Sequence, residues 1–335
     1  MEPILIQKAQ PTAGDVHVNR PLANVSVAYF QEQSSFVADQ VFPNVPVQKK
    51  SDVYYTIPKG AFNRDQMSKR APGTESKGVG YELSSDSYIC DVYGLHHPIP
   101  DEVRANYDSP LSADREATEL LTHAGLIRRE VEWVSNFFVT SKWTTERAGV
   151  ASGPTGTQFL RWDVANSTPI SDVDGAKVAV EELTGRMVNT MVIDRHTLKA
   201  LQNHADILDR LKYGQTAPNP AEVTLNILAQ IFGMKRVLVS RAIKNTAVEG
   251  ATDSHSFIAG KNALLCYVPD RPGLYTPAAG YTFSWNGYLG AAAQGQRIRK
   301  YREEKKTSDI VEIDMAFVQK LVGADLGAFF LNTVS

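Results

Sequence analysis

The sequence of 335 residues lacks most of the features by which common protein classes are identified. Cysteine is scarce: Cys90 and Cys266 lie in apolar strand-like runs and form neither a disulfide framework nor a CxxC metal knuckle. We therefore expect two buried, reduced thiols. No basic segment followed by an apolar one suggests a signal peptide, and no run approaches the ~20 apolar residues of a membrane span.

An excess of charge of one sign is also missing. The chain has 35 basic and 37 acidic residues, which gives a formal net charge of −2. This balance excludes a global field that would attract nucleic acid or an anionic membrane. Hydrophobic residues make up 43% and charged residues 21%, which is an ordinary globular composition.

Catalytic and phosphate-binding motifs are absent as well. The sequence has no GxSxG nucleophile elbow, no GxxxxGKS/T loop, no GxGxxG fingerprint and no HExxH. The strongest metal candidate is HHPIPDE, with His96, His97, Asp101 and Glu102. Prolines interrupt this stretch, and adjacent histidines diverge on a regular backbone. We therefore favour a strand end followed by a helix start, with both acids near the positive end of the helix dipole.

A second candidate, for acid–base chemistry, comprises Asp194, His196, His204 and Asp206. The sequence places no nucleophile or further carboxylate beside them. We therefore favour residues on a helix surface, with Asp194 as the N-cap.

Residues 112–139 carry the strongest helix signal in the chain, with Ser112 as the expected N-cap. A helix of about 27 residues would be roughly 40 Å long, more than twice the length of an average helix. Apolar residues spaced three and four apart predict one buried face: Ala117, Leu120, Ala124, Ile127, Val131, Val134 and Phe138. The opposite, polar face is expected to carry Arg115, Glu119, Arg129 and Glu130.

A long polar stretch lies between two strand-like segments. Val53, Tyr55 and Ile57 alternate with polar residues, which predicts a strand. The tongue, as we call Pro58–Leu83, then carries five Lys or Arg, three Asp or Glu and four Gly, with little to bury. The chain returns through the apolar segment Tyr88–Leu95. This pattern predicts a long hairpin with a buried base and an exposed tip.

The remaining chain alternates helical and strand patterns over 166–296 and ends in long strands over 297–335. The run from Arg297 to Lys306 has six basic and two acidic residues. A phosphate-binding patch is one interpretation. The acids that follow in TSDIVEID favour cross-strand ion pairs, either within the chain or between chains.

This order of parts resembles the major capsid proteins of tailed bacteriophages. Local stretches are similar too: RAPGTES to the loop called the E-loop, DREATELLTHAGLIRREVEWVSNFF to the spine helix, and SDIVEIDMAFVQKLVGADLGAFF to the closing strands. The resemblance covers nearly the whole chain and implies an α+β fold. Its parts would be an N-terminal arm (1–47), an E-loop hairpin (48–92), a P-domain with the spine helix (93–165), an inserted α/β A-domain (166–296) and closing P-domain strands (297–335).

The resemblance implies a structural protein rather than an enzyme, with no cofactor and no metal. Copies would assemble into hexamers and pentamers of an icosahedral shell, the virion capsid, around packaged double-stranded DNA. No long helical scaffolding region precedes the arm, so we expect a separate scaffolding protein. A portal and, in some assemblies, decoration proteins would be further partners, with assembly in the host bacterial cytoplasm and no membrane involved.

Inter-subunit contacts are expected in two charged regions. In the E-loop these residues are Lys59, Arg64, Asp65, Lys69, Arg70, Glu75 and Lys77. In the P-domain strands they are Arg297, Arg299, Arg302, Glu303 and Glu304. Two alternatives stay open: an encapsulin-type shell around a protein cargo, and an α/β enzyme with a site near His96, His97 and Asp101.

Overall fold

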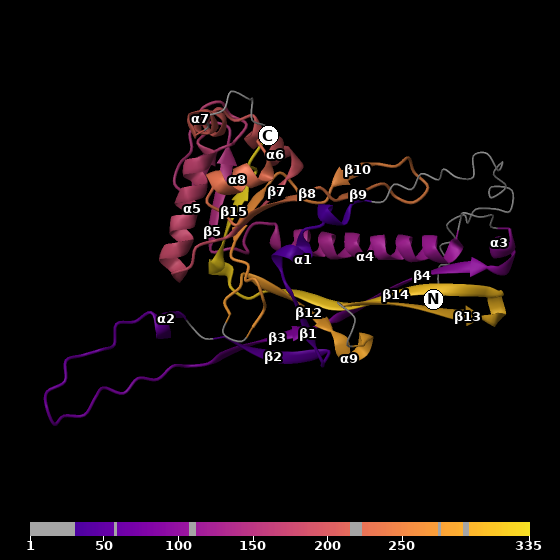
Figure 1. Ribbon diagram of the computed structural model, residues 1–335, viewed down its shortest axis with the longest axis horizontal. Coiled ribbons are helices and arrows are strands. Elements are labelled where there is room, and N and C mark those ends of the chain that lie inside the picture. Colours follow the sequence, from indigo (N-terminus) through magenta and orange to yellow (C-terminus); the bar gives the residue numbers. More distant parts are fainter. Residues whose placement is uncertain (1–30, 57–58, 107–111, 215–222, 274–275, 291–294) are drawn as a thin grey trace.

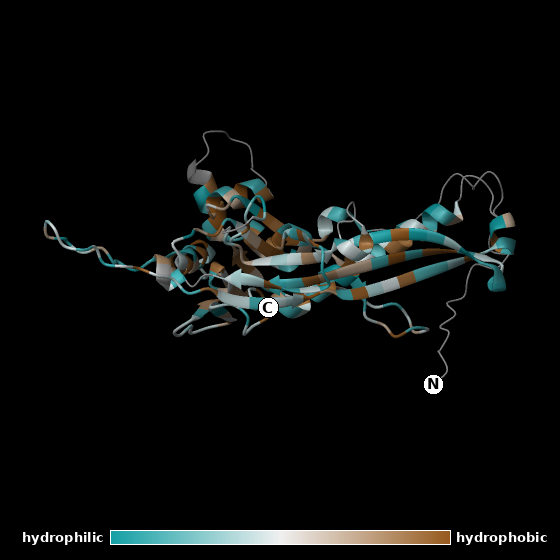
Figure 2. Cartoon of the chain, turned by 90° about the horizontal axis from the view of Figure 1, so that it is seen from below, coloured by the Kyte–Doolittle hydropathy of each residue, from teal (hydrophilic) through white to brown (hydrophobic). Residues whose placement is uncertain are grey.

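The computed structural model describes residues 31–56, 59–106, 112–214, 223–273, 276–290 and 295–335. The molecule is elongated (Figure 1), with a helix-covered sheet at one end, a long helix over a second sheet at the other, and a projecting hairpin below. Figure 2 shows hydrophobic residues concentrated in the body and a largely hydrophilic tongue outside it. Among the described residues no helix is long and apolar enough to cross a membrane.

The long helix α4 (Ala113–Phe137) confirms the predicted spine. Ser112 occupies the N-cap position, although its side chain makes no capping hydrogen bond. The buried face differs from the predicted one and consists of Ala117, Leu121, Gly125, Arg129, Glu130, Trp133, Val134 and Phe137. Leu120, predicted to be buried, is half-exposed. Arg129 and Glu130, predicted to be on the polar face, are buried because a second layer of the chain covers them.

A five-stranded sheet lies against α4. Its order is β1-β12-β14-β13, with β4 also paired to β14. The strands are β1 (Asn44–Val47), β4 (Asp91–Pro100), β12 (Gly280–Trp285), β13 (Gln296–Glu303) and β14 (Ser308–Leu321). Leu121 of the helix shares a buried cluster with Ile313 and Met315 of β14. A Cβ at Gly125 would lie 2.8 Å from the sulfur of Met315, so the helix lies close to the sheet at this point.

A second, six-stranded sheet has the order β6-β5-β15-β11-β7-β8. Its strands are β5 (Thr145–Val150), β6 (Gln158–Leu160), β7 (Thr190–Asp194), β8 (Arg236–Ser240), β11 (Ala263–Cys266) and β15 (Gly327–Leu331). Helices of the same part of the chain bury their apolar residues on it: α5 (Pro169–Thr184), α6 (Arg195–Gln202), α7 (Ala205–Gly214) and α8 (Leu225–Ile231). A small hairpin of β9 (Ile243–Asn245) and β10 (His255–Phe257) follows β8.

Strand pairing cuts across two of the predicted segment boundaries. β5 and β6 precede residue 166, and β15 follows residue 297, yet all three belong to the six-stranded sheet. β12 precedes residue 296 but pairs with β14 of the other sheet. The sequence pattern did not predict these sheet memberships because the strands are short and their partners are distant in sequence.

Residues 31–47, which we call the strap, run across both sheets. The strap contains the 3-10 turn η1 (Gln33–Ser35), the short helix α1 (Ala38–Val41) and β1. The sequence predicted a helical patch here but not β1, which pairs in parallel with β12. Phe42 is fully buried, with its ring 4.9 Å from that of Phe137. Residues 1–30 of the predicted arm lie outside the described residues.

Several local predictions hold. Asp194 caps α6, because its carboxylate accepts from the backbone N–H groups of His196 and Thr197. Cys90 and Cys266 are buried free thiols. His204, however, is buried rather than on a helix surface, with Nε2 2.9 Å from the Ser167 hydroxyl.

Candidate assembly surfaces

The projecting hairpin has an ordered stem. β2 (Ser51–Thr56) pairs antiparallel with β3 (Ser84–Ile89) over six residue pairs. Its base is fixed to the five-stranded sheet, since the ring centroids of Tyr54 and Tyr88 lie 5.6 and 4.7 Å from that of Phe283. The Tyr54 hydroxyl donates to Asp86 at 2.7 Å, and burial together with this bond raises the pKa of Tyr54. The stem is therefore anchored where the strands leave the body.

The tongue beyond the stem has no layer of its own chain over it. After the short helix α2 (Lys59–Phe62), no further helix or strand occurs before β3. Its side chains are almost all exposed, including apolar ones such as Met67 at 95% and Tyr81 at 59%. The tongue extends away from the body in both views (Figures 1 and 2).

The charged side chains of the tongue are likewise exposed. Only Lys59 has an ion pair in the described part of the chain, 2.5 Å from Asp325. The other predicted contact residues are exposed and form no salt bridge among the described residues: Arg64, Asp65, Lys69, Arg70, Glu75 and Lys77. The side chains are therefore available for contacts outside the chain.

The stem adds exposed apolar residues to this surface. Val53, Tyr55 and Ile89 are exposed on the two stem strands, and Val92 and Leu95 on β4, which follows. Tyr55 alone is 74% exposed. Exposed apolar side chains along the stem and the strand that follows it are typical of a surface that is covered by a partner.

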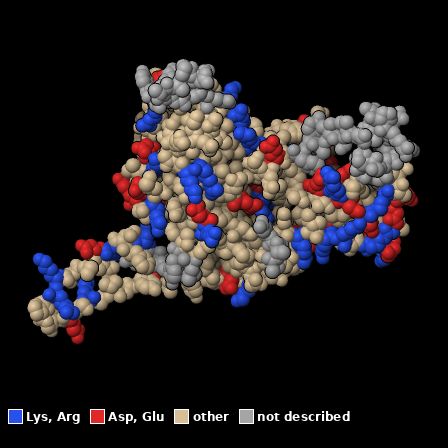
Figure 3. Space-filling view, viewed as in Figure 1, with Lys and Arg blue, Asp and Glu red and all other residues tan. Residues whose placement is uncertain are grey.

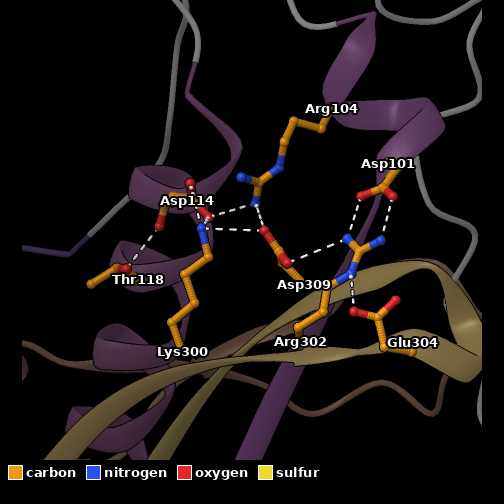
Figure 4. Close-up of polar contacts among 8 residues, drawn as sticks. All are labelled: Asp101, Arg104, Asp114, Thr118, Lys300, Arg302, Glu304 and Asp309. Carbon is orange, nitrogen blue, oxygen red and sulfur yellow. Dashed lines mark hydrogen bonds and ion pairs between the residues drawn. The ribbon is translucent and has the colours of Figure 1, made fainter.

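The opposite end of the molecule is also densely charged (Figure 3), but here the charges meet inside one chain. We call this cluster the charged tip: Asp101, Arg104, Asp114, Lys300, Arg302, Glu304 and Asp309 (Figure 4). It joins the start of α4, the edge of β13, the start of β14 and the short helix α3 (Asp101–Ala105).

Asp309 lies at the centre of the charged tip. Its carboxylate is 3.0 Å from Arg104, 3.4 Å from Lys300 and 3.4 Å from Arg302. Asp114 bridges Arg104 at 2.8 Å and Lys300 at 3.0 Å. Each cation thus contacts at least two acids, which restrains all four elements relative to one another.

Arg302 forms the second centre of the charged tip. Its guanidinium makes a two-pronged contact with Asp101, both bonds 2.5 Å long, and reaches Glu304 at 3.7 Å. The hydrogen bonds from Arg302 lower the pKa of Asp101. Burial alone would raise the pKa of Asp309, but the bonds from Lys300 and Arg302 outweigh it and the pKa is lowered.

No protein-family model matches the chain. The major capsid protein of Burkholderia phage BcepMu is 25% identical over 315 residues, covering 92% of this chain and 94% of the relative. The major capsid protein of Pseudomonas phage JBD67 is 24% identical over 324 residues, covering 95% and 97%. Both alignments extend over nearly the whole of each chain.

Solved structures agree with these relatives. A phage-related protein from Bordetella bronchiseptica RB50 superimposes with a TM-score of 0.66, at 22% identity and with 90% of this chain and 94% of the other covered. The capsid structure of cyanophage P-SCSP1u gives a TM-score of 0.62 at 12% identity, with 99% and 98% covered. This chain has the tailed-phage capsid fold. The resemblance predicted from the sequence is therefore confirmed, and so is the α+β class.

Within this capsid fold, the predicted contact residues of the closing strands all have partners in their own chain. Arg297 and Arg299 reach the buried Asp314 at 3.0 and 3.3 Å, and Glu303 lies 3.2 Å from Lys306. Arg302 and Glu304 belong to the charged tip. The prediction of ion pairs across these strands is confirmed within the chain. That the same residues contact a neighbouring subunit stays a prediction.

The capsid fold also explains the HHPIPDE segment. His96 and His97 lie on β4 with different exposure, the first exposed and the second half-buried, as expected for adjacent strand residues. Burial and the neighbouring His96 lower the pKa of His97. Asp101 begins α3 and is held by Arg302. Among the described residues no group of three or more histidine, cysteine or acidic side chains is placed to hold a metal.

Sequence reasoning missed most of the charged tip, namely Arg104, Asp114, Lys300 and Asp309. The missing information was the register that places Asp309 opposite Arg302 across β13 and β14. It also missed Glu130, although a signal existed. Leu126, Glu130, Trp133 and Phe137 are four, three and four residues apart, which places the acid on the apolar side of α4.

Proposed function

We propose that the chain is a structural shell subunit, a major capsid protein whose function is self-assembly into an icosahedral capsid enclosing a phage genome. The observation that carries this proposal is the near full-length relationship to two phage proteins that are themselves called major capsid proteins. The capsid fold and the uncovered tongue support it, because both suit a chain that completes its contacts by association.

The parts of the capsid fold then take the following roles. Residues 1–47 are the N-terminal arm, whose described portion is the strap, and 48–92 form the E-loop hairpin. The five-stranded sheet with α4 is the P-domain, and the six-stranded sheet with its helices is the A-domain. The six charged tongue residues that have no ion pair among the described residues are proposed, with Lys59, as inter-subunit contacts. Arg297, Arg299, Arg302, Glu303 and Glu304 are proposed to present a preformed charged edge to a neighbour.

The proposal includes the partners expected from the sequence. Hexamers and pentamers of the chain form the shell, with a separate scaffolding protein, a portal and, in some assemblies, decoration proteins. Double-stranded DNA is packaged inside without specific recognition, and assembly takes place in the host cytoplasm. The role is structural rather than catalytic.

The test is assembly by the purified full-length chain, with and without a candidate scaffolding protein from the same source. We expect capsomers or closed shells by sedimentation velocity and negative-stain microscopy. A stable monomer under all these conditions would overturn the proposal.

A second candidate is an encapsulin-type shell. An encapsulin complex from Synechococcus elongatus PCC 7942 superimposes with a TM-score of 0.54 at 14% identity, with 93% of each chain covered. This is lower than the values for the phage-related and cyanophage structures, so we favour the phage capsid. Particles isolated from their natural source distinguish the two, because a capsid holds DNA and an encapsulin holds a protein cargo.

A further inference from the structure

The strap is attached at both ends and in the middle. Near its start, the Gln31 side chain accepts from the backbone N–H of Ile243 at 2.7 Å and donates to the same residue's carbonyl at 2.8 Å. At its end, β1 pairs with β12. The middle is held by the Arg129–Asp39 ion pair at 2.7 Å, by the Ser35 and Gln40 carbonyls, which accept from Arg241 and Arg236, and by a single buried carboxylate.

That carboxylate belongs to Glu130 of α4, which is fully buried. Its Oε2 accepts from the backbone N–H groups of Val37 and Ala38, each at 2.9 Å. Its Oε1 lies 2.9 Å from the Ser240 hydroxyl of β8, which donates to it. One side chain of the spine helix thus connects the strap to the last residue of a strand in the other sheet.

We propose that Glu130 is a proton-controlled fastener, which holds the strap on α4 when it is protonated and loosens it when it is charged. The hydrogen bonds of the Glu130 carboxyl can form whether it is charged or protonated. The two strap N–H groups face Oε2 in either state. A proton on Oε1 can be donated to the Ser240 oxygen, which reverses the direction of that one hydrogen bond. This inference concerns a single chain and does not rest on the proposed function.

The direction of this pH effect follows from the burial of Glu130. Burial raises the pKa of Glu130 to about 7, from 4.5, against the opposing effect of its three hydrogen bonds. Release of the strap exposes the carboxyl to water and returns its pKa toward the ordinary value. The protonated form therefore favours the closed strap, and this contribution is lost as pH rises from about 4.5 through about 7.

The charged neighbours support this direction. On the strap, Asp39 raises the pKa of Glu130 further by repulsion. The adjacent cation Arg129 is engaged with Asp39 at 2.7 Å. On β8 the group that faces Glu130 is the uncharged Ser240 hydroxyl. Among the described residues no salt bridge to Glu130 is present to hold its charged form.

Hydrogen exchange of the unassembled full-length chain, read on strap peptides by mass spectrometry, tests the proposal. Rates are corrected for intrinsic pH dependence, with the buried strand β11 as internal reference. We expect the strap to open more at about pH 8 than at about pH 5. The expected ratio is roughly 50- to 100-fold for a carboxyl whose pKa rises from 4.5 to about 7 when the strap closes.

Glu130→Gln keeps the shape and one acceptor oxygen but cannot titrate, so its opening should be the same at both pH values. Glu119→Gln is the matched control, because Glu119 is exposed on the same helix and pairs with Arg115 at 3.0 Å. It should retain the wild-type ratio. Ser240→Ala removes a donor to the carboxylate and should move the midpoint of opening to higher pH.

Two results would overturn the proposal: wild-type opening that does not change with pH, or a Glu130→Gln variant that keeps the wild-type ratio. If Glu130→Gln fails to fold, the Ser240→Ala midpoint decides instead. A midpoint that stays at the wild-type pH would then overturn it.

Discussion

The tongue and the charged tip are both dense in charge, and the sequence predicted inter-subunit contacts for seven residues of the tongue and for Arg302 and Glu304 of the charged tip. In the structure the two regions differ in where their charged side chains find partners. In the charged tip, strands β13, β14 and β4 lie in register, so that arginines and lysines face acids of the same chain. The tongue has no facing strand, and apart from Lys59 its charges have no ion-pair partner among the described residues. Charge density alone therefore does not indicate an intermolecular contact, and strand topology decides where the partners lie.

The largest expected effect comes from removing the tongue. Replacing residues 62–78 by a short turn should leave a folded subunit that forms no closed shells, because the side chains of this segment are almost all exposed in the described chain. Negative-stain microscopy measures the shells, and thermal unfolding checks that the subunit is folded.

Normal capsids from this deletion would refute an assembly role for the tongue. An unfolded subunit would contradict the difference between the tongue and the charged tip, since it would mean that the tongue stabilises its own chain.

Two glycines allow a comparison of packing. A Cβ at Gly280 would lie 2.4 Å from the Phe42 ring and 2.7 Å from the Lys320 carbonyl, whereas a Cβ at Gly78 in the tongue meets nothing within 4 Å. Gly280→Ala should lower the free energy of unfolding by about 1–3 kcal/mol. Gly78→Ala should change it by less than about 0.5 kcal/mol. Denaturant unfolding of unassembled subunits measures both, and equal losses would contradict the comparison.

Replacing an arginine should likewise lower the stability of the subunit more in the charged tip than in the tongue. Arg302→Ala removes a cation partner of Asp101, Asp309 and Glu304, and should lower the free energy of unfolding by a small but measurable amount, since the site is largely exposed. Arg70→Ala in the tongue should be neutral within about 0.3 kcal/mol.

Unfolding at low and at about 1 M salt provides the control for the arginine pair. The Arg302→Ala loss should shrink at high salt, because screening weakens exposed ion pairs. A loss that is independent of salt would indicate a packing effect instead.

The smallest expected effect is an acid dependence confined to the charged tip. Asp101 and Asp309 have lowered pKa values in the folded chain, so the stability they contribute is present above the unfolded value of about 3.9. It is lost as pH falls through their lowered folded values. Wild type should therefore lose stability below about pH 4 more steeply than Arg302→Ala. Parallel pH profiles of the two proteins would contradict this assignment.

Much of the fold was predictable because its signals are local. The spacing of apolar residues located α4 to within a few residues of its observed ends. Alternation located β2, and the long polar gap after it predicted the tongue. Asp194 could be identified as a cap because capping depends on the next three residues.

The remainder depended on contacts between distant residues. β5 has a polar sequence and is a strand because β15, at the other end of the chain, pairs with it. Glu130 was assigned to the surface by its charge, since nothing local shows that the strap supplies its hydrogen-bond donors. The charged tip required a register between β13 and β14 that a single sequence does not specify.

The strap also imposes an order on biosynthesis. The Thr282 hydroxyl donates to the Phe42 carbonyl across 240 residues of sequence. At a translation rate of about 5–20 residues per second, the strap leaves the ribosome roughly 10 to 50 s before that partner is made. During this interval Phe42 lacks part of the surface that later buries it, because Gly280 of β12 lies against its ring. The strap therefore completes its packing late although it is synthesised early, and until then its apolar residues are open to chaperones and to aggregation.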